Sequence, residues 1–234
     1  MINLRNNSKN NNYRILTEQI NLTSKDLDTK STSEIVHLFS EADKEPQEAV
    51  ENAIPEIVNA IDEITVRLKS NGRLFYIGTG TSGRLGVLDA SECPPTFCTN
   101  PDLVQGIIAG GIPSLTRSSE SLEDVSEIAI ADLKERDFSN RDVLIGITAS
   151  GRTPYVLSAL NYSKRLRALT ISISSVPFCD SSLSNDIDIR LITGPEILAG
   201  STRLKAGTAS KMALNIISTS VMIQLGKVLS LIHI

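Results

Sequence analysis

A glycine-rich loop, 78–83, stands between a short apolar run, 74–77, and a segment of helical character that starts near Arg84. Its glycines follow the pattern Gly-x-Gly-x-x-Gly, and hydroxyl residues lie between them. Glycine lets the backbone approach a ligand closely, while the free N–H groups and the dipole of a helix start favour negative charge. The loop therefore predicts a phosphate-binding site.

Carboxylates follow this loop in the sequence. Glu92 comes directly before Cys93-Pro94-Pro95. Because proline disfavours a helix interior, we predict that the helix ends here and that the prolines hold the carboxylate in place. Three more acids come early in the segment after the second predicted strand: Glu120, Glu123 and Asp124. Acids at a helix start often complement the helix dipole, so dipole stabilisation and catalysis are alternative roles for them.

Two other interpretations of the glycines fit poorly. A dinucleotide-binding site needs an acid at the end of the second strand, but Asp102 precedes that strand and Gly110-Gly111 ends it. A P-loop needs Lys and a hydroxyl residue after its last glycine, and the loop has neither there. Ser82 and Ser150 lack the sequence around a hydrolase nucleophile and a suitably placed histidine, so we interpret them as ligand donors.

Strands and helices alternate after the first 72 residues. The predicted strands cover 74–77, 103–109, 143–148, 168–172 and 187–192. The predicted helices include 114–134, 154–165 and 203–227. Near-continuous apolar strands separated by helices are typical of a parallel sheet covered on both faces, so the predicted fold class is α/β with a doubly wound, five-stranded parallel sheet. Ligands bind beyond the carboxyl ends of such strands, where the loops of this chain are rich in glycine and hydroxyl residues.

The first part of the chain is predicted to be a disordered tail, 1–12, followed by a helical extension, 13–72. Ser31 and Glu34 match a capping box that starts one helix, and Pro46 is placed to open a second.

An apolar stripe runs through the extension from Val50 to Leu68 in steps of three and four. Pro55 within it implies a kink or a late helix start, and Asn71-Gly72 is a C-terminal stop signal. The stripe either packs against the domain or forms a dimer seam, and the sequence leaves both alternatives open.

The composition is typical of a soluble globular protein, with 41% hydrophobic and 21% charged residues among 234. A net charge of -4 and the lack of Trp argue against binding to nucleic acid or to an anionic membrane. No apolar run is long enough to span a bilayer, and the Asn-rich start lacks a signal core. Three cysteines and two widely separated histidines indicate free thiols in a reducing, cytoplasmic compartment and argue against a metal site.

The stretch 76–97 closely resembles the N-acetylmuramic acid 6-phosphate etherase family, above all in Gly-Thr-Gly-Thr-Ser-Gly-Arg-Leu-Gly-Val-Leu-Asp-Ala-Ser-Glu-Cys-Pro-Pro. Shorter matches lie at 27–29, 108–111, 149–155, 194–196, 200–209 and 225–228. The likeness covers residues 16–228 in register, which makes it far more specific than the glycine loop alone.

The resemblance implies a sugar isomerase (SIS) type domain over 73–228 that binds a phosphosugar, a homodimer, and no metal or organic cofactor. It also implies a lyase reaction in which the D-lactyl ether at C3 of N-acetylmuramic acid 6-phosphate is eliminated and water adds back. The products are N-acetylglucosamine 6-phosphate and D-lactate, in the recycling of the bacterial cell wall.

Two catalytic acids carry over from the family. Glu92 matches the acid of Ser-Glu-Cys-Pro-Pro, which donates a proton to the leaving ether oxygen, and Glu123 matches the acid that relays a proton at C2. This division suits the chemistry, because elimination next to a carbonyl needs a base at the α carbon and an acid at the leaving oxygen. A glutamic acid that donates near neutral pH needs a pKa raised to about 6–7, which a dry pocket bearing phosphate charge would favour.

The expected phosphate and sugar donors are residues of the hydroxyl-rich loops: Thr81, Ser82, Ser150, Gly151, Arg152 and Thr153. Arg203 and Lys205, near the start of the last helix, are expected to help neutralise the phosphate dianion.

The chain departs from the family pattern in two places. Cys98-Thr99-Asn100 replaces glycine and small apolar residues, and 229–234 does not match the helical region with which the family continues, so we expect a truncated or misread end. Two rival functions on the same fold are a non-catalytic phosphosugar-binding regulator, like the longer glucokinase regulatory proteins, and an aldose–ketose isomerase. The pair Glu92 and Glu123 favours the enzyme over the regulator, and Ser-Glu-Cys-Pro-Pro disfavours the isomerase.

Overall fold

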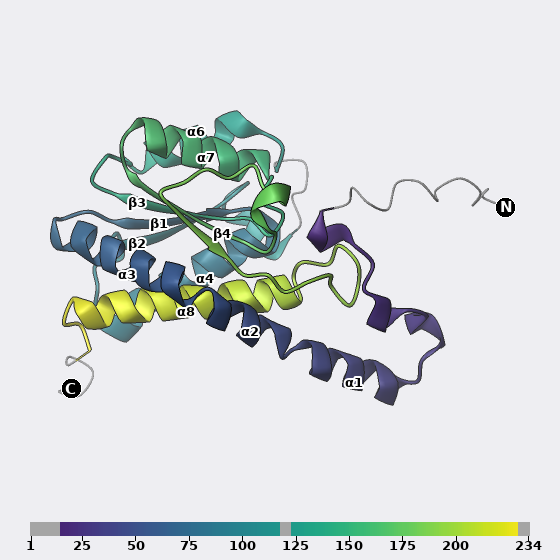
Figure 1. Cartoon of the computed structure of the whole chain (residues 1–234). Helices are drawn as coiled ribbons and strands as arrows, with labels where there is room; N and C mark the ends of the chain where they lie inside the picture. Colours follow the sequence, from purple (N-terminus) through teal and green to yellow (C-terminus); the bar gives the residue numbers. More distant parts are fainter. Residues whose placement is uncertain (1–14, 118–122, 229–234) are drawn as a thin grey trace.

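The computed structural model describes residues 15–117 and 123–228 (Figure 1). The predicted disordered tail, the tail 229–234 and the acid Glu120 lie outside the described residues.

The five predicted strands are confirmed and form one parallel sheet in the order β2-β1-β3-β4-β5. Their bounds are Leu74–Gly78 (β1), Val104–Ile108 (β2), Val143–Ile147 (β3), Leu169–Ser174 (β4) and Ile187–Arg190 (β5). Every residue of β1, β3 and β4 is buried, as expected for central strands of a parallel sheet. The ends differ from the prediction by one or two residues; β4, for example, ends at Ser174 rather than at residue 172.

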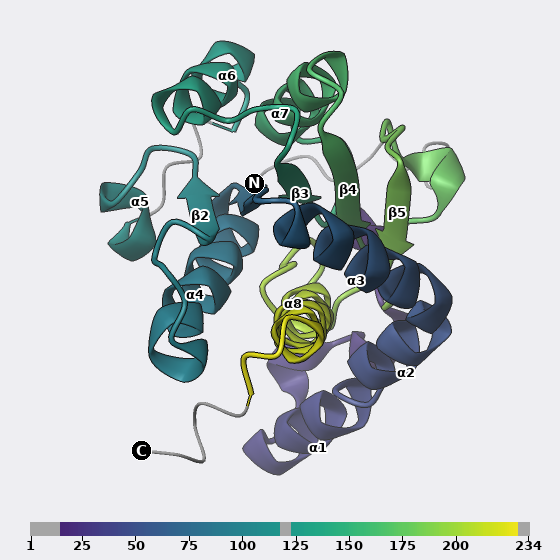
Figure 2. The same ribbon diagram turned by 90° about the vertical axis from the view of Figure 1, so that its left-hand side faces the viewer.

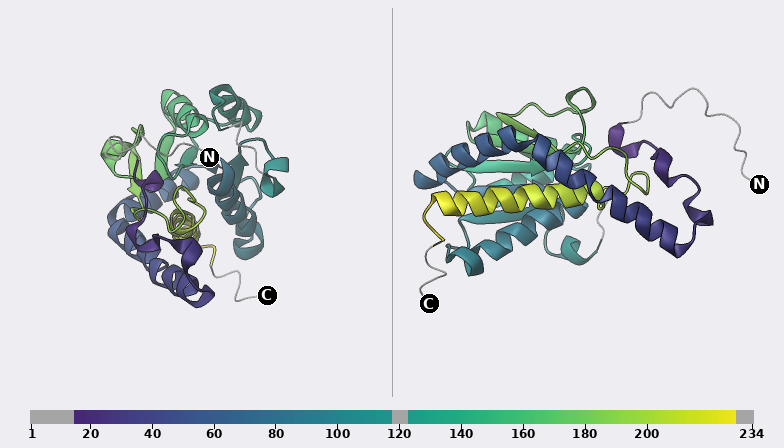
Figure 3. Two further views of the ribbon diagram at one scale, coloured as in Figure 1. Left: turned by 90° about the vertical axis from the view of Figure 1, so that its right-hand side faces the viewer. Right: turned by 60° about the horizontal axis from the view of Figure 1, so that its bottom comes forward.

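Helices cover both faces of the sheet, so the doubly wound fold is confirmed (Figures 1 and 2). One face carries α3 (Ile54–Lys69), α4 (Gly80–Phe97) and α8 (Lys205–Gln224), and α8 lies lengthwise between the other two (Figure 3). The opposite face carries α6 (Ser126–Glu135) and α7 (Pro154–Arg165). Alternate strand residues therefore enter two separate apolar cores.

The N-terminal extension begins with short 3-10 turns, Leu16–Glu18, Leu22–Ser24 and Leu27–Thr29, followed by three helices. The predicted capping box is confirmed at the start of α1 (Thr32–Ala42), and Pro46 lies in the first turn of α2 (Glu45–Asn52). Pro55 lies in the first turn of α3, so the late helix start is the correct alternative.

The apolar stripe of the extension packs against the sheet, which confirms the first of its two proposed roles. Five of its residues belong to the buried core: Val50, Ile57, Ile61, Ile64 and Leu68. After α3, Asn71 adopts a left-handed conformation, and the N–H of Gly72 donates to the carbonyl of Arg67. The predicted helix stop is therefore confirmed.

Two helix predictions were wrong. The helix predicted over 114–134 is divided into α5 (Pro113–Thr116) and α6, because Arg117 is extended and ends α5. The helix predicted to end before Pro94-Pro95 starts earlier and continues through both prolines to Phe97. Burial of Cys93 and Phe97 in the core stabilises this last part of α4 and outweighs the helix hydrogen bonds that the prolines remove.

The start of α8 is held by a buried carboxylate. Glu196 accepts hydrogen bonds from the backbone N–H groups of Lys205 and Ala206, each at 3.0 Å, and is itself 1% exposed. Burial raises the pKa of Glu196, while these hydrogen bonds oppose the shift. Glu196 thus satisfies two free N–H groups of the helix start and fixes the end of the segment that leads into α8.

Asp142 ties the start of β3 to the start of β1. Its carboxylate, 2% exposed, accepts from the guanidinium and backbone N–H of Arg73 and from the N–H and hydroxyl of Ser139. Burial by itself would raise the pKa of this carboxyl, but the hydrogen bonds and the charge of Arg73 outweigh burial and lower it.

We predict that Asp142→Asn lowers the free energy of unfolding by about 2–4 kcal/mol at pH 7, because Arg73 loses its carboxylate partner. The pKa of Asp142 in the folded chain lies below its ordinary value of 3.8. Its contribution is therefore fully present above pH 3.8 and is lost as the pH falls through the folded pKa. Urea unfolding measures the free energy of unfolding of both chains at pH 7 and at about pH 3. The difference between Asp142→Asn and wild type should be smaller at the lower pH. The exposed Asp102, changed to Asn, is the control, and equal losses in the two variants would contradict the assignment.

We predict that Glu196→Ala destabilises the chain by about 2–4 kcal/mol, since two buried N–H groups at the start of α8 lose their acceptor. Glu196→Gln, which keeps one oxygen acceptor, should cost about half as much. Thermal unfolding measures both. Glu127, an exposed acid in the first turn of α6, is the matched control, and Glu127→Ala should change stability by no more than about 0.5 kcal/mol. Similar melting temperatures for Glu196→Ala and wild type would refute the role of Glu196.

Candidate active site

A polar cavity of about 230 Å³ lies beyond the carboxyl ends of β1 and β3, where the strand order reverses. Such a switch point is the usual ligand site of an open parallel sheet. Its lining comes from five parts of the chain: Thr17, Glu18, Thr79, Gly80, Thr81, Ser82, Glu123, Thr148, Ala149, Ser150, Thr153, Gly200 and Thr202. Hydroxyl groups dominate this lining, as the loops predicted.

The loop after β1 places the N-terminus of α4 beside this cavity. Gly80 has a φ of 48°, a left-handed conformation that glycine adopts without strain. The loop also passes very close to the strand, since a Cβ at Gly83 would lie 2.6 Å from the carbonyl oxygen of Gly78. Because a helix N-terminus carries free N–H groups and positive partial charge, this part of the cavity is suited to an anion such as phosphate.

The loop after β3 forms the second wall. The hydroxyls of Thr148 and Thr153 are 2.8 Å apart and hydrogen-bonded, and Gly151 turns the chain at a φ of 65°. This wall ends at the start of α7, so a second helix N-terminus lies close to the cavity. Gly151 is buried and does not line the cavity, whereas Arg152 lines an adjoining cavity of about 380 Å³ and donates from Nε to the carbonyl of Asp180.

Glu123 lines both cavities. Its carboxylate lies next to the N-terminus of α4, since a Cβ at Gly80 would meet Glu123 Oε1 at 3.4 Å. Its carbonyl accepts from the N–H of Tyr155 at 3.1 Å, which fixes it against the first turn of α7. The Tyr155 hydroxyl in turn donates to Asp132 on α6. The acid chosen from the sequence is therefore held beside the loops chosen as phosphate donors.

The N-terminal arm supplies two lining residues, Thr17 and Glu18, that the sequence reasoning missed. The arm is held in place by two hydrogen bonds, from the Asn21 amide to the carbonyl of Pro195 and from the Leu16 N–H to Asp180. Glu18 lines both cavities and is exposed. The arm belongs to residues 13–30 of the sequence, which have no clear periodicity, so no local signal indicated that it reaches the cavity.

Glu92 does not lie with Glu123. It is exposed on the outer side of α4 and does not line either cavity. It follows Gly80 by twelve helical residues, which at about 1.5 Å per residue places it about 18 Å from the phosphate loop.

The two cations predicted near the last helix also lie elsewhere. Arg203 is exposed and does not line the cavities, although its neighbour Thr202 does. Lys205 is buried, and its ammonium group is paired with Glu45 of α2 at 2.5 Å. Lys205 therefore connects α8 to the extension and does not line the cavity.

Asp89 connects α4 to both the sheet and α8. Its buried carboxylate accepts from the hydroxyl of Tyr76 at 2.9 Å, from the amide of Asn215 at 2.7 Å and from the hydroxyl of Ser218 at 3.1 Å. Burial raises the pKa of Asp89, against the opposing effect of these donors. The network sets the rotation of α4 and so determines which residues of that helix face outward.

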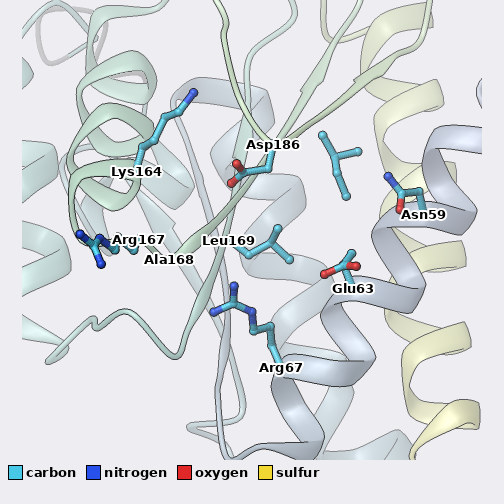
Figure 4. A pocket seen from close by; sticks show the side chains of 9 residues that line it. Asn59, Glu63, Arg67, Lys164, Arg167, Ala168, Leu169 and Asp186 are labelled. Atoms are coloured by element: carbon cyan, nitrogen blue, oxygen red, sulfur yellow. The ribbon is translucent and has the colours of Figure 1, made fainter.

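A larger cavity, about 550 Å³, lies at the amino ends of β4 and β5 (Figure 4). Its charged groups are largely engaged in the fold. Lys164 donates to the carbonyl of Ser184, Arg67 donates to that of Asn140, and Asp186 accepts from Thr170. Neither a glycine-rich loop nor a helix start faces it, and it lies at the edge of the sheet away from the ligand end. The cavity beside Glu123 is therefore the better candidate.

The described part of the chain contains neither a cluster of three or more His, Cys, Asp or Glu that could hold a metal ion nor a helix that could span a membrane.

The fold is shared with proteins that bind or convert phosphosugars. The model of the glucokinase regulatory protein N-terminal SIS domain matches residues 56–164. A phosphoheptose isomerase of Neisseria gonorrhoeae aligns with a TM-score of 0.60 and 16% identity, over 83% of this chain and 98% of that one. The Vibrio vulnificus NanR protein complexed with ManNAc-6P aligns with a TM-score of 0.58 and 13% identity, over 88% of this chain and 70% of that one. At these identities the likeness shows the fold alone.

Sequence relatives define the family. An N-acetylmuramic acid 6-phosphate etherase of Prochlorococcus marinus (strain NATL1A) is 85% identical over 223 residues, which is 95% of this chain and 72% of the relative. The etherase of strain MIT 9313 is 60% identical over 93% of this chain and 69% of its own length. That of Synechococcus sp. (strain CC9605) is 55% identical over 92% of this chain and 68% of its own length. Identity at this level over nearly the whole chain shows that it belongs to the N-acetylmuramic acid 6-phosphate etherase family.

Proposed function

We propose that this chain cleaves the D-lactyl ether of N-acetylmuramic acid 6-phosphate. A base removes the C2 proton of the open-chain sugar, the C3–O bond breaks, and D-lactate leaves as its ether oxygen takes up a proton. Water then adds across the resulting double bond, with its hydroxyl on C3 and a proton on C2, to give N-acetylglucosamine 6-phosphate. Both steps need one acid–base group at C2 and another at C3.

The observation that carries this proposal is the position of Glu123 beside the N-terminus of α4. A carboxylate next to a phosphate-binding helix start is placed to act on a sugar whose phosphate is bound there. Thr81 and Ser82 on one loop and Ser150 and Thr153 on the other supply hydroxyl donors for the phosphate and the sugar. We assign Glu123 the proton relay at C2.

We assign Glu92 the role of proton donor to the ether oxygen. This assignment is supported by the family resemblance of Ser-Glu-Cys-Pro-Pro and not by a position in the cavity. Among the described residues, Glu18 is the other acid that lines the cavity beside Glu123, so it is the rival for the donor role. We also propose that the chain works as a homodimer in the cytoplasm.

A phosphosugar-binding regulator on this fold is the alternative function, and the match to the glucokinase regulatory protein domain is compatible with it. That match covers only the shared fold of residues 56–164, whereas the etherase relatives match nearly the whole chain at high identity. The presence of Glu123 next to the phosphate loops also favours chemistry over binding alone. Release of D-lactate discriminates between the two functions.

We predict that Glu92→Gln and Glu123→Gln each lower the rate of D-lactate release by about 10²–10⁴-fold, because each removes one acid–base group. The affinity for N-acetylglucosamine 6-phosphate should change little, since the phosphate donors remain. An enzymatic D-lactate assay and calorimetric titration measure the two quantities. Glu63→Gln, an exposed change on α3, is the control and should behave as wild type.

Three outcomes would revise the proposal. Normal lactate release by Glu123→Gln would remove Glu123 from the mechanism. Loss of activity in Glu18→Gln together with normal activity in Glu92→Gln would transfer the donor role to Glu18. Phosphosugar binding without any lactate release by the wild-type chain would favour the regulator.

A further inference from the structure

Two cavities meet beside Glu123. One, of about 230 Å³, contains the glycine-rich loop after β1, and the adjoining one, of about 380 Å³, contains Arg152. Four residues line both of them: Glu18, Glu123, Ser150 and Thr153. The substrate of the proposed function carries two anionic groups, a phosphate on C6 and the carboxylate of the lactyl group on C3. A sugar whose C2 lies at Glu123 can therefore place one anionic group in each cavity.

The adjoining cavity offers few backbone donors to a phosphate, although α7 starts beside it. The first residue of α7 is Pro154, which has no N–H. The N–H of the next residue, Tyr155, donates to the carbonyl of Glu123 at 3.1 Å. By contrast, the first residues of α4, 80–82, carry N–H groups that the helix leaves free, and they line the smaller cavity. The start of α4 is therefore the better phosphate site.

Arg152 supplies the positive charge of the adjoining cavity. Among the described residues that line this cavity it is the one cation. Its Nε donates to the carbonyl of Asp180 at 2.6 Å, which fixes the guanidinium group. Its two terminal nitrogens have no hydrogen bond, and the side chain has no ion pair, to any residue that the structure describes. The anchored guanidinium thus presents parallel N–H groups, an arrangement that matches a carboxylate.

The acids around Arg152 favour a singly charged ligand group over a phosphate. Glu18 and Glu123 border both cavities, whereas Asp124 lines only the adjoining one. Each acid repels an anion in proportion to the charge of that anion, which is one for a carboxylate and about two for a phosphate. A paired, charge-assisted hydrogen bond from Arg152 offsets the smaller repulsion more readily. The adjoining cavity is therefore suited to a carboxylate.

We propose that Arg152 binds the carboxylate of the lactyl group and so selects the ether substrate. This inference rests on the proposed function, because that function supplies the lactyl group. The phosphate lies at the start of α4, C2 lies at Glu123, and the substituent on C3 enters the cavity of Arg152. The product N-acetylglucosamine 6-phosphate lacks the carboxylate, so Arg152 distinguishes the substrate from the product.

Selectivity between two substrates tests the proposal. The probes are N-acetylmuramic acid 6-phosphate and its lactamide analogue, in which a neutral amide replaces the carboxylate. Wild type should prefer the acid by about 10–100-fold in kcat/KM, the range for a charge-assisted pair. Arg152→Gln should lose about the same factor with the acid and little with the amide, so its preference should disappear. Arg152→Lys keeps the charge without the paired N–H groups and should be intermediate.

Product binding and a second arginine are the controls. The affinity for N-acetylglucosamine 6-phosphate, measured by calorimetric titration, should be the same in wild type and Arg152→Gln, because the product does not reach Arg152. Arg165→Gln, an exposed change in the last turn of α7, should keep the wild-type preference for the acid.

The outcomes separate the inference from the function. Loss of product affinity in an Arg152→Gln chain with a wild-type circular dichroism spectrum would assign Arg152 to the phosphate or the sugar and overturn the proposal. Lactate release with the same acid-to-amide ratio in wild type and Arg152→Gln overturns the role of Arg152 and leaves the proposed function standing. A wild-type chain without lactate release overturns the proposed function, and the inference fails with it.

A second experiment measures the carboxylate site without turnover. In a Glu123→Gln chain, which should not consume the substrate, calorimetry gives the affinity for intact N-acetylmuramic acid 6-phosphate. This affinity should exceed that for N-acetylglucosamine 6-phosphate by about 10-fold or more. Adding Arg152→Gln to the same chain should remove the difference. Equal affinities for the two sugars in the Glu123→Gln chain would contradict the carboxylate site.

Discussion

The close approach of α4 to the sheet is the constraint on which the cavity depends. A Cβ at Gly106 of β2 would lie 2.5 Å from the Cα of Val87, and one at Gly86 would lie 2.8 Å from the Cβ of Tyr76. The helix backbone therefore lies against the β2 backbone at Gly106 and against the Tyr76 side chain at Gly86, and a larger residue at either glycine would push the helix away. This contact directs the first turn of α4 toward the ends of β1 and β3, where its free N–H groups reach the cavity. Asp89 then fixes the rotation of the helix by hydrogen bonds to both neighbouring layers.

Much of the architecture could be predicted from the sequence because its signals are local. The apolar runs predicted all five strands, the capping residues Ser31 and Glu34 predicted the start of α1, and the glycine and hydroxyl loops predicted the end of the sheet where the polar cavity lies. Parallel strands bring these loops together by topology alone, so neighbours in the cavity can be predicted without long-range information. Glu123 was selected by the family resemblance, because the residues alone left dipole stabilisation and catalysis as alternative roles for it.

What the sequence did not indicate has a common cause, which is tertiary packing that no local pattern records. Helix α4 continues through Pro94-Pro95 because its last turns are buried, and the arm reaches the cavity because distant residues hold it there. The ion pair of Lys205 with Glu45, a carboxylate from the other end of the chain, also had no local signal in the sequence. The placement of Glu92 on the outer side of α4 depends likewise on which side of that helix the core selects.

The ion pair between Glu45 and Lys205 joins residues 160 positions apart, and α2 and α3 both pack against α8. During synthesis on the ribosome, the helices of the extension emerge before α8, the helix that covers them. The side of their apolar stripe that α8 covers therefore stays exposed to solvent until α8 has been made. The extension therefore folds stably only after a segment far along the chain has been made, which favours transient exposure of apolar surface in the nascent chain.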